Sequence, residues 1–230
     1  MEAIILAGGF GKRLKGLAGN VPKPMASINN IPFLDYLLTY LLKNNINKVV
    51  FSVFYKYEII KKYFNNSFKG IDIDYSIDEI KLGTGGAIKH SLDLTNEENI
   101  LIINGDTFFD IDISKFYNDH LINNNDVTLS LKLMRNFDRY GFVETTDNGK
   151  VLSFKKKQFC KTGKIDGGIY LIKKNIFNNN PNPKVFSFND FLIKNLNTIK
   201  VGSLLFDDLF IDIGTPEDLN KAQKIFKEKP

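Results

Sequence analysis

An apolar run leads directly into a glycine-rich loop in Ala3-Ile4-Ile5-Leu6-Ala7-Gly8-Gly9-Phe10-Gly11-Lys12-Arg13-Leu14. A short, continuous apolar run before such a loop is typical of a buried parallel strand. Glycines at the end of a strand allow the backbone to approach a phosphate closely and to direct N–H groups at it. The stretch therefore predicts an α/β fold with a phosphate-binding loop after its first strand.

Two common phosphate-binding loops do not fit this stretch. The dinucleotide fingerprint needs a third glycine, but Leu14 stands at that position. A P-loop needs a glycine five residues before its Gly-Lys pair and a Ser or Thr after it, and these positions hold Leu6 and Arg13. The remaining candidate is a loop that works with two cations, Arg13 inside it and Lys23 in Val21-Pro22-Lys23-Pro24-Met25.

Composition excludes several other classes of protein. The chain has 230 residues, 43% hydrophobic and 25% charged, which is ordinary for a soluble protein and allows one domain over residues 1–230. The net charge of +5 suits a phosphate-rich substrate, and no nucleic-acid-binding motif accompanies it.

Cys160 is the only cysteine, which excludes an intrachain disulfide and a cysteine metal cluster. Because residues 1–6 lack signal-peptide features and no apolar run has membrane-spanning length, we expect a cytoplasmic protein.

Strand and helix patterns alternate along the first half of the chain. Apolar residues at helical spacing predict a helix over residues 33–43, with Pro32 placed to start it. The other expected elements are strands at 3–6, 48–54, 71–77 and 100–103 and helices at 57–64 and 85–92. This alternation predicts a parallel sheet with helices on both faces.

The strand–helix alternation ends in the second half of the chain, where several predicted strands are joined by short turns. Asp147-Asn148-Gly149 is a strong hairpin signal between two of them. The expected strands cover residues 127–133, 141–145, 151–154 and 168–172, and helices follow near 189–195 and 216–226. We expect these strands to extend the sheet, which gives a Rossmann-like, mixed but mostly parallel sheet.

Motifs in a fixed order resemble the signature of the sugar-1-phosphate nucleotidyltransferase family. They are Gly8-Gly9-x-Gly11-x-Arg13-Leu14 with Pro22-Lys23-Pro24-Met25, Leu82-Gly83-Thr84-Gly85-Gly86-Ala87, Asn104-Gly105-Asp106, Gly167-Gly168-Ile169-Tyr170, and Ile211-Asp212-Ile213-Gly214-Thr215-Pro216-Glu217-Asp218. Each motif alone is weakly specific, but together they span nearly the whole chain. The resemblance implies the nucleotide-diphospho-sugar transferase fold, with a nucleotide-binding N-terminal half and a sugar-phosphate-binding C-terminal half.

The reaction of this family needs neither a general base nor a covalent nucleophile. A sugar-1-phosphate oxygen is already anionic, so the enzyme must align it with the α-phosphorus of a nucleoside triphosphate and neutralise charge. The resemblance implies Arg13 and Lys23 as the catalytic cations, and His90 and His120 are interpreted as ordinary helix-face or surface residues. The residues expected to bind the nucleotide are Leu6, Ala7, Gly8, Gly9, Gly11, Lys12, Arg13, Lys23, Glu79, Gly83 and Thr84.

Two aspartates are candidates for a metal site. Asp106 follows an apolar strand, and Asp212 lies in a second apolar run. Two carboxylates with phosphate oxygens and waters suit octahedral Mg²⁺, and the resemblance assigns that role to both. Asp110 and Asp112 alternate with apolar residues and are interpreted as the exposed face of a strand.

The sugar-phosphate site is expected to contain Asn104, Gly141, Lys157, Asp166, Gly167 and Gly168. Three positions depart from the family pattern: Lys12 replaces a usual Thr, Lys156 a usual Glu, and Asp166 a usual Asn. Gly167 and Gly168 carry no side chain and would leave room for a longer sugar.

Within the family, the motif set is most similar to the D-glycero-α-D-manno-heptose 1-phosphate guanylyltransferases. This implies GTP as donor and a GDP-heptose for capsule or other surface polysaccharide, and Asp78 or Glu79 offers a carboxylate for the N–H donors of guanine. Two alternatives stay open: a mannose or glucose 1-phosphate guanylyl-, cytidylyl- or thymidylyltransferase, and a sugar-nucleotide-binding regulator without activity. The expected partners are GTP and a sugar 1-phosphate rather than nucleic acid or a membrane. The sequence does not fix the oligomeric state, and a homodimer stays open.

Overall fold

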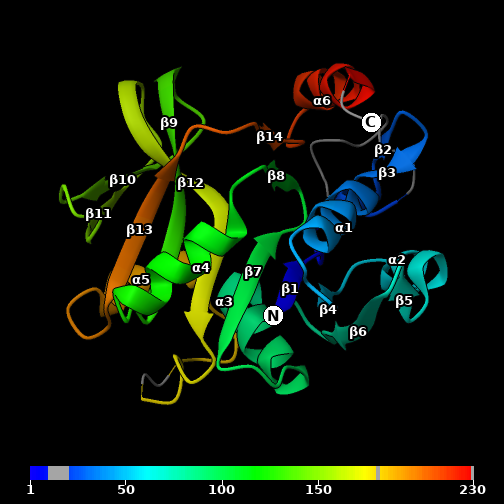
Figure 1. Cartoon of the computed structure of the whole chain (residues 1–230), viewed down its shortest axis with the longest axis horizontal. Coiled ribbons are helices and arrows are strands. Elements are labelled where there is room, and N and C mark those ends of the chain that lie inside the picture. Colours follow the sequence, from blue (N-terminus) through cyan, green and yellow to red (C-terminus); the bar gives the residue numbers. More distant parts are fainter. Residues whose placement is uncertain (10–20, 180–181, 229–230) are drawn as a thin grey trace.

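A mixed sheet of eight strands, in the order β13-β9-β12-β7-β1-β4-β6-β5, forms the centre of the computed structural model (Figure 1), which describes residues 1–9, 21–179 and 182–228. The strands are β1 (Glu2–Leu6), β4 (Lys48–Val53), β5 (Ser67–Phe68), β6 (Ile71–Ile77), β7 (Asn99–Asn104), β9 (Val127–Phe137), β12 (Cys160–Lys173) and β13 (Val201–Phe206). β1 pairs in parallel with β4 and β7, and β4 with β6, whereas β12 runs antiparallel between β7 and β9. The predicted α/β fold with a mixed, mostly parallel sheet is confirmed.

Helices cover both faces of this sheet. They are α1 (Phe33–Lys43), α2 (Tyr57–Phe64), α3 (Gly83–Ser91), α4 (Ile113–Ile122), α5 (Phe188–Asn195) and α6 (Pro216–Glu228), with the short 3₁₀ helices η2 (Lys23–Met25) and η3 (Leu92–Leu94). One apolar cluster joins the sheet to α1, α2, α4 and α6, and a second joins it to α3 and α5. None of the helices in the described ranges is both long enough and apolar enough to cross a membrane.

The central position of β1 in the sheet explains why residues 3–6 form a continuous apolar run. Successive side chains of a strand point to opposite faces. Ala3 and Ile5 therefore pack in the first cluster and Ile4 in the second, and all three are fully buried. A strand covered on both faces reads as a continuous apolar run rather than as an alternating one.

Three small two-stranded sheets lie outside the central one. They are β2 (Ser27–Ile28) with β3 (Ile31–Pro32), β8 (Thr107–Phe109) with β14 (Phe210–Asp212), and β10 (Phe142–Thr145) with β11 (Val151–Lys155). β8 and β14 are far apart in sequence, and their antiparallel pairing places Asp212 opposite Thr107. This pairing brings the segments of the two candidate metal ligands together.

Several expectations about the second half need correction. The hairpin at Gly149 exists, with Gly149 at φ +80°, but β10 and β11 pair only with each other and do not extend the central sheet. Asp110 and Asp112 do not form the exposed face of a strand, because the chain turns there into helix α4. Asp112 caps that helix, since its Oδ1 accepts a hydrogen bond from the Lys115 amide over 2.9 Å.

Candidate active site

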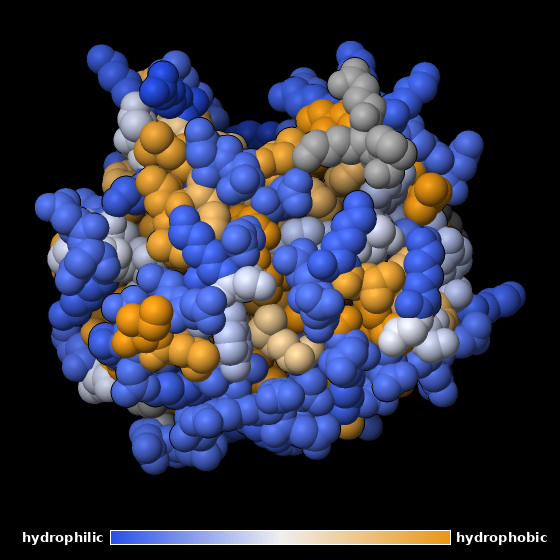
Figure 2. Space-filling view, in the orientation of Figure 1, coloured by the Kyte–Doolittle hydropathy of each residue, from blue (hydrophilic) through white to orange (hydrophobic). Residues whose placement is uncertain are grey.

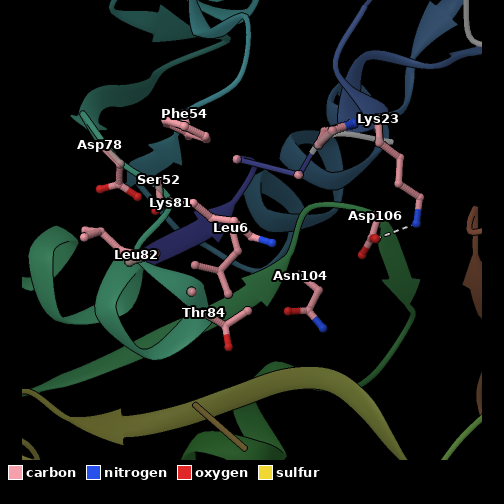
Figure 3. A pocket seen from close by; sticks show the side chains of 15 residues that line it. Leu6, Lys23, Ser52, Phe54, Asp78, Lys81, Leu82, Thr84, Asn104 and Asp106 are labelled. Carbon is pink, nitrogen blue, oxygen red and sulfur yellow. Dashed lines mark hydrogen bonds and ion pairs between the residues drawn. The ribbon is translucent and has the colours of Figure 1, made fainter. Parts of the chain in front are cut away.

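A cleft opens at the carboxyl ends of β1, β4 and β7 and against the start of α3. Ligands bind at this edge of open α/β sheets. The cleft has a volume of about 310 Å³, a size found for small-molecule sites. Figure 3 shows Asp78 at one end and Lys23 with Asp106 at the other. The lining residues are Leu6, Gly8, Gly9, Lys23, Pro24, Ser52, Phe54, Asp78, Lys81, Leu82, Gly83, Thr84, Ala87, Asn104 and Asp106.

The glycine-rich loop enters this cleft directly from β1. The Ala7 amide donates to the Ser52 carbonyl over 2.8 Å and continues the pairing with β4, so Ala7 is buried beneath the cleft rather than in its lining. Gly8 and Gly9 follow at the surface of the cleft. Three further predicted residues, Gly11, Lys12 and Arg13, lie outside the described residues.

The glycines around α3 serve close packing at the other wall of the cleft. Gly83 has φ +73°, and a Cβ there would lie 2.5 Å from the carbonyl oxygen of Phe186. A Cβ on Gly85 would lie 2.3 Å from the Phe186 ring. The motif therefore lets the segment before α5 pack against the start of α3, while Gly83 and Thr84 still line the cleft.

One acidic side chain, Asp78, points into the cleft beyond the end of β6 (Figure 3). Its side chain is only 6% exposed, and its Oδ1 lies 2.8 Å from Nδ1 of His90. Burial is the largest influence and raises the pKa of the Asp78 carboxyl, against the opposing effect of His90. Glu79, the residue singled out for nucleotide binding, is exposed and is not among the lining residues, whereas its neighbour Asp78 is one of them.

At the opposite end, Lys23 lies between the two predicted metal ligands. Its side chain is 10% exposed, and its Nζ is 2.5 Å from Oδ2 of Asp106 and 3.6 Å from Oδ1 of Asp212. The Ile213 amide donates to the Asp106 carbonyl over 3.0 Å, which ties the two segments beside the β8–β14 pair. Three residues separated by up to 189 positions thus form one charged cluster.

This cluster is supported by two side chains that sequence reasoning missed. The Tyr140 hydroxyl donates to Oδ2 of Asp212 over 3.1 Å. Arg139 binds Asp218 at 2.7 Å and reaches within 4.0 Å of Asp212. Burial and the Asp212 charge raise the pKa of Tyr140, so its hydroxyl stays protonated as a donor. Figure 2 shows the molecule notched between helix α6 and the far ends of β9 and β12. The ion pair of Arg139, just after β9, with Asp218, on α6, joins these two parts of the chain.

Two smaller hollows lie on the side of β12, and one of them shares Leu6, Thr84 and Asn104 with the cleft. Asp166 and Asn189 line both, Gly141 and Lys157 line one, and Asn104 lines the other. Asp166 accepts hydrogen bonds from the Gly168 amide at 2.9 Å and the Tyr170 hydroxyl at 2.7 Å. Burial outweighs both bonds and raises the pKa of Asp166. The expected residues therefore gather here, and Asn189 joins them without any sequence signal that marked it.

The two glycines after Asp166 serve packing within the chain. A Cβ on Gly167 would lie 2.6 Å from the Phe109 ring, and one on Gly168 would lie 2.9 Å from Nδ2 of Asn104. Gly168 also has φ +75°, a conformation that favours glycine. Because Gly167 and Gly168 carry no side chain, Phe109 and Asn104 can pack closely against them. The expectation that these glycines leave room for a longer sugar finds no support in this geometry. Lys156 is exposed and outside the lining of both hollows.

The donor set at Asp106 and Asp212 is compatible with Mg²⁺ only when a substrate contributes. Within the described residues, no group of three His, Cys, Asp or Glu side chains could hold a metal ion. Mg²⁺ commonly binds through one or two carboxylates and completes its shell with phosphate oxygens and waters. Asp106, which lines the end of the cleft, and Asp212, which lies on the other side of Lys23, are compatible with that arrangement.

Comparisons with known proteins agree with this geometry. The family model described as "Nucleotidyl transferase" matches residues 2–229. The chain is 50% identical to D-glycero-alpha-D-manno-heptose 1-phosphate guanylyltransferase of Campylobacter jejuni, over 95% of this chain and 96% of that protein. It is 48% identical to the protein of the same name from Aneurinibacillus thermoaerophilus, over 97% of both. The crystal structure of HddC from Yersinia pseudotuberculosis complexed with GMP-PN superposes with a TM-score of 0.87 at 35% identity, over 98% of this chain and 99% of that one.

Proposed function

This chain belongs to the nucleotidyl transferase family, and within it we propose that it transfers GMP from GTP to D-glycero-α-D-manno-heptose 1-phosphate, with release of pyrophosphate. It is a nucleotidyltransferase with the nucleotide-diphospho-sugar transferase fold. The observation that carries the specific assignment is identity of 50% and 48%, over nearly the whole chain, to two guanylyltransferases that act on this sugar phosphate.

The chemistry follows from a nucleophile that is already charged. A phosphate oxygen of the sugar 1-phosphate forms a bond to the α-phosphorus, and the bond from that phosphorus to the bridging oxygen of pyrophosphate breaks. Lys23 lines the end of the cleft beside Asp106, and in this proposal it neutralises the charge that develops on the α-phosphate. Arg13 holds the triphosphate in this proposal, a role that comes from the motif alone.

Mg²⁺ is the proposed cofactor, with Asp106 and Asp212 as its protein ligands. When bound, it would supply positive charge to the phosphate oxygens and help to orient them. Because the carboxylates lie beside Lys23, metal and lysine would act on the same part of the triphosphate.

Asp78 is the proposed reader of the base. Guanine presents two adjacent donors, N1–H and N2–H₂, and a carboxylate offers two acceptor oxygens. Asp78 lies at the far end of the cleft from Lys23. A nucleotide whose phosphates bind at Lys23 would extend its base toward that end. In this proposal Asp78 takes the contact that the sequence alone suggested for Glu79.

The sugar phosphate is proposed to bind beside the cleft, in the hollows lined by Asp166, Asn189, Lys157, Gly141 and Asn104. Lys157 would contact the phosphate, and Asp166 and Asn189 would contact sugar hydroxyls.

We further propose one domain over residues 1–230, a cytoplasmic location, and a product used for capsule or other surface polysaccharide. A homodimer is compatible with this function.

Pyrophosphate release tests the assignment. The purified protein is incubated with Mg²⁺, each of GTP, CTP, UTP and dTTP, and either the heptose 1-phosphate or α-mannose 1-phosphate. The highest kcat/KM is expected for GTP with the heptose, which has one more hydroxymethylene group than mannose. A pocket that only accommodates that group discriminates by about 10–200-fold, whereas one that hydrogen-bonds its hydroxyl reaches about 10⁴.

The same matrix separates the alternatives. Preference for mannose or glucose 1-phosphate would identify a hexose-1-phosphate enzyme, and equal use of pyrimidine triphosphates would reject GTP as the dedicated donor. A sugar-nucleotide-binding regulator would release no pyrophosphate with any pair.

A further inference from the structure

We propose that His90 is a positioning residue that orients the Asp78 carboxylate toward the base, and that it thereby sets the selectivity for guanine. The proposal rests on the proposed function, in which Asp78 reads the base of GTP. His90 lies on α3 and had no role in sequence reasoning, which treated it as an ordinary helix-face residue.

The contact between the two side chains is short and specific. Nδ1 of His90 lies 2.8 Å from Oδ1 of Asp78, and Oγ of Ser76 lies 3.3 Å from the same nitrogen. The Asp78 amide donates to the Val53 carbonyl over 2.9 Å and continues the β4–β6 pairing. The backbone of Asp78 is thus held by the sheet, while the plane of its carboxylate is held by the helix.

The arrangement leaves acceptor capacity for a ligand. His90 is the only partner recorded for the Asp78 side chain in the described part of the chain, and it contacts Oδ1 alone. Figure 3 shows the carboxylate in the cleft wall, and Asp78 is among the lining residues. Each carboxylate oxygen has two lone pairs, so Oδ2 and the second lone pair of Oδ1 can both accept.

Orientation matters most for a ligand that uses both oxygens. The two donors of guanine lie in the plane of the base, so they require both oxygens of Asp78 in nearly that plane. A carboxylate that rotates freely keeps one hydrogen bond easily but loses the second. Inosine triphosphate (ITP) differs from GTP only by lacking the 2-amino group, so the ratio of the two affinities measures the second bond.

The experiment measures dissociation constants of GTP and ITP by calorimetry, with Mg²⁺ and without sugar phosphate, and those of CTP and dTTP for the wild type. The variants are His90→Leu, which removes the donor at similar size, and His90→Asn, whose side-chain nitrogen can replace Nδ1. Lys89→Leu, on the exposed side of the same helix and outside the cleft lining, is the matched control. Asp78→Ala, alone and with His90→Leu, tests whether His90 acts through Asp78.

The expected wild-type preference for GTP over ITP is about 10–100-fold, as for a hydrogen bond to a charged group. It should fall below about threefold in His90→Leu, recover in His90→Asn, and stay unchanged in Lys89→Leu. In the Asp78→Ala background, His90→Leu should change nothing further. Thermal unfolding of each variant shows that a lost preference is not lost folding.

The two proposals fail in different ways. If the wild type binds GTP no better than CTP or dTTP, the proposed guanylyl transfer is wrong. If the wild type and Lys89→Leu prefer GTP but His90→Leu keeps that preference, the positioning role is wrong while the function stands. A preference that survives Asp78→Ala, or that His90→Asn fails to restore, also overturns the role of His90.

Discussion

The Tyr140 hydroxyl donates a hydrogen bond to Oδ2 of Asp212 over 3.1 Å. Tyr140 stands between β9 and β10 and lines a hollow with Lys157 and Asp166, whereas Asp212 ends β14 beside Lys23. This single bond connects the wall proposed for the sugar phosphate with a carboxylate proposed for the metal. Sugar-phosphate binding and metal binding are therefore expected to influence each other through Tyr140.

Tyr140→Phe removes the hydroxyl and leaves the ring. We expect the Mg²⁺ concentration for half-maximal rate to rise and kcat/KM to fall about tenfold, since a hydrogen bond to a charged group is lost. A magnesium titration of the rate measures both. Tyr63→Phe is the control, because the Tyr63 hydroxyl also donates to a carboxylate, that of Asp35, away from the cleft. An unchanged magnesium requirement in Tyr140→Phe would contradict the coupling.

Lys23→Ala should lower kcat rather than raise the KM for GTP. The reason is that charge on the α-phosphate develops in the transition state, and loss of one such stabilising group typically costs about 10²–10³ in rate. Steady-state kinetics at saturating substrates measure the effect. Lys132→Ala removes an equal charge from a residue that pairs with Asp207 and should keep normal rates. A Lys23→Ala enzyme with normal kcat would reject the assignment.

Asp106→Ala and Asp212→Ala should each fold normally and bind Mn²⁺ more weakly in the presence of GTP. The physical reason is the loss of one of two protein carboxylates in a shell that phosphate oxygens and waters complete. Electron paramagnetic resonance of free Mn²⁺ measures the affinity without any turnover. Asp207→Ala, an exposed carboxylate that pairs with Lys132, is the control. Full activity of the double variant, or wild-type rates in EDTA, would refute the metal site.

His120 should make the folded protein less stable in acid. It is 1% exposed and hydrogen-bonds to Thr128 at 2.8 Å and Asn99 at 3.1 Å. Burial, helped by the charge of Lys173, lowers the pKa of His120 to about 4. Because this folded pKa lies below the unfolded value of about 6.5, the neutral ring stabilises the fold above pH 6.5, and this stability is lost as the pH falls toward 4.

The size of that effect is on the order of 3 kcal/mol for a shift of this extent. Urea denaturation of the wild type and of His120→Gln between pH 7 and pH 4 measures it. The variant is expected to be less stable at pH 7 but to lose less stability on acidification. Parallel curves for the two proteins would show that His120 does not contribute.

Some elements were predictable because their signal is local. Helices α1 and α2 begin and end at the predicted residues, since apolar spacing and Pro32 act within a few turns of the chain. Strand β1 was predictable for another reason: it is covered on both faces, and after Glu2 all its residues, 3–6, are apolar. The ordered motifs likewise indicated the family, which the family model confirms over residues 2–229.

Other elements carried a weaker signal. The sequence predicted neither α4 nor the edge strand β13, and it extended the central sheet with β10 and β11, which pair elsewhere. A hairpin pattern specifies that two strands pair with each other, but not whether a third strand accepts them. Asp112 was interpreted as a strand residue because alternation over a few residues also occurs at the start of a helix.

Between Asp78 and Glu79, sequence reasoning had no means to choose. Both are acidic and adjacent, and the choice depends on the pairing of the Asp78 amide with Val53 and on helix α3, which brings His90 against the carboxylate. The same holds for Tyr140 and Asn189, which reach the candidate site from segments with no motif of their own. Spacing along a strand or helix reports which residues are buried, whereas the direction of one polar side chain depends on neighbours that are distant in sequence and become neighbours only when the chain packs.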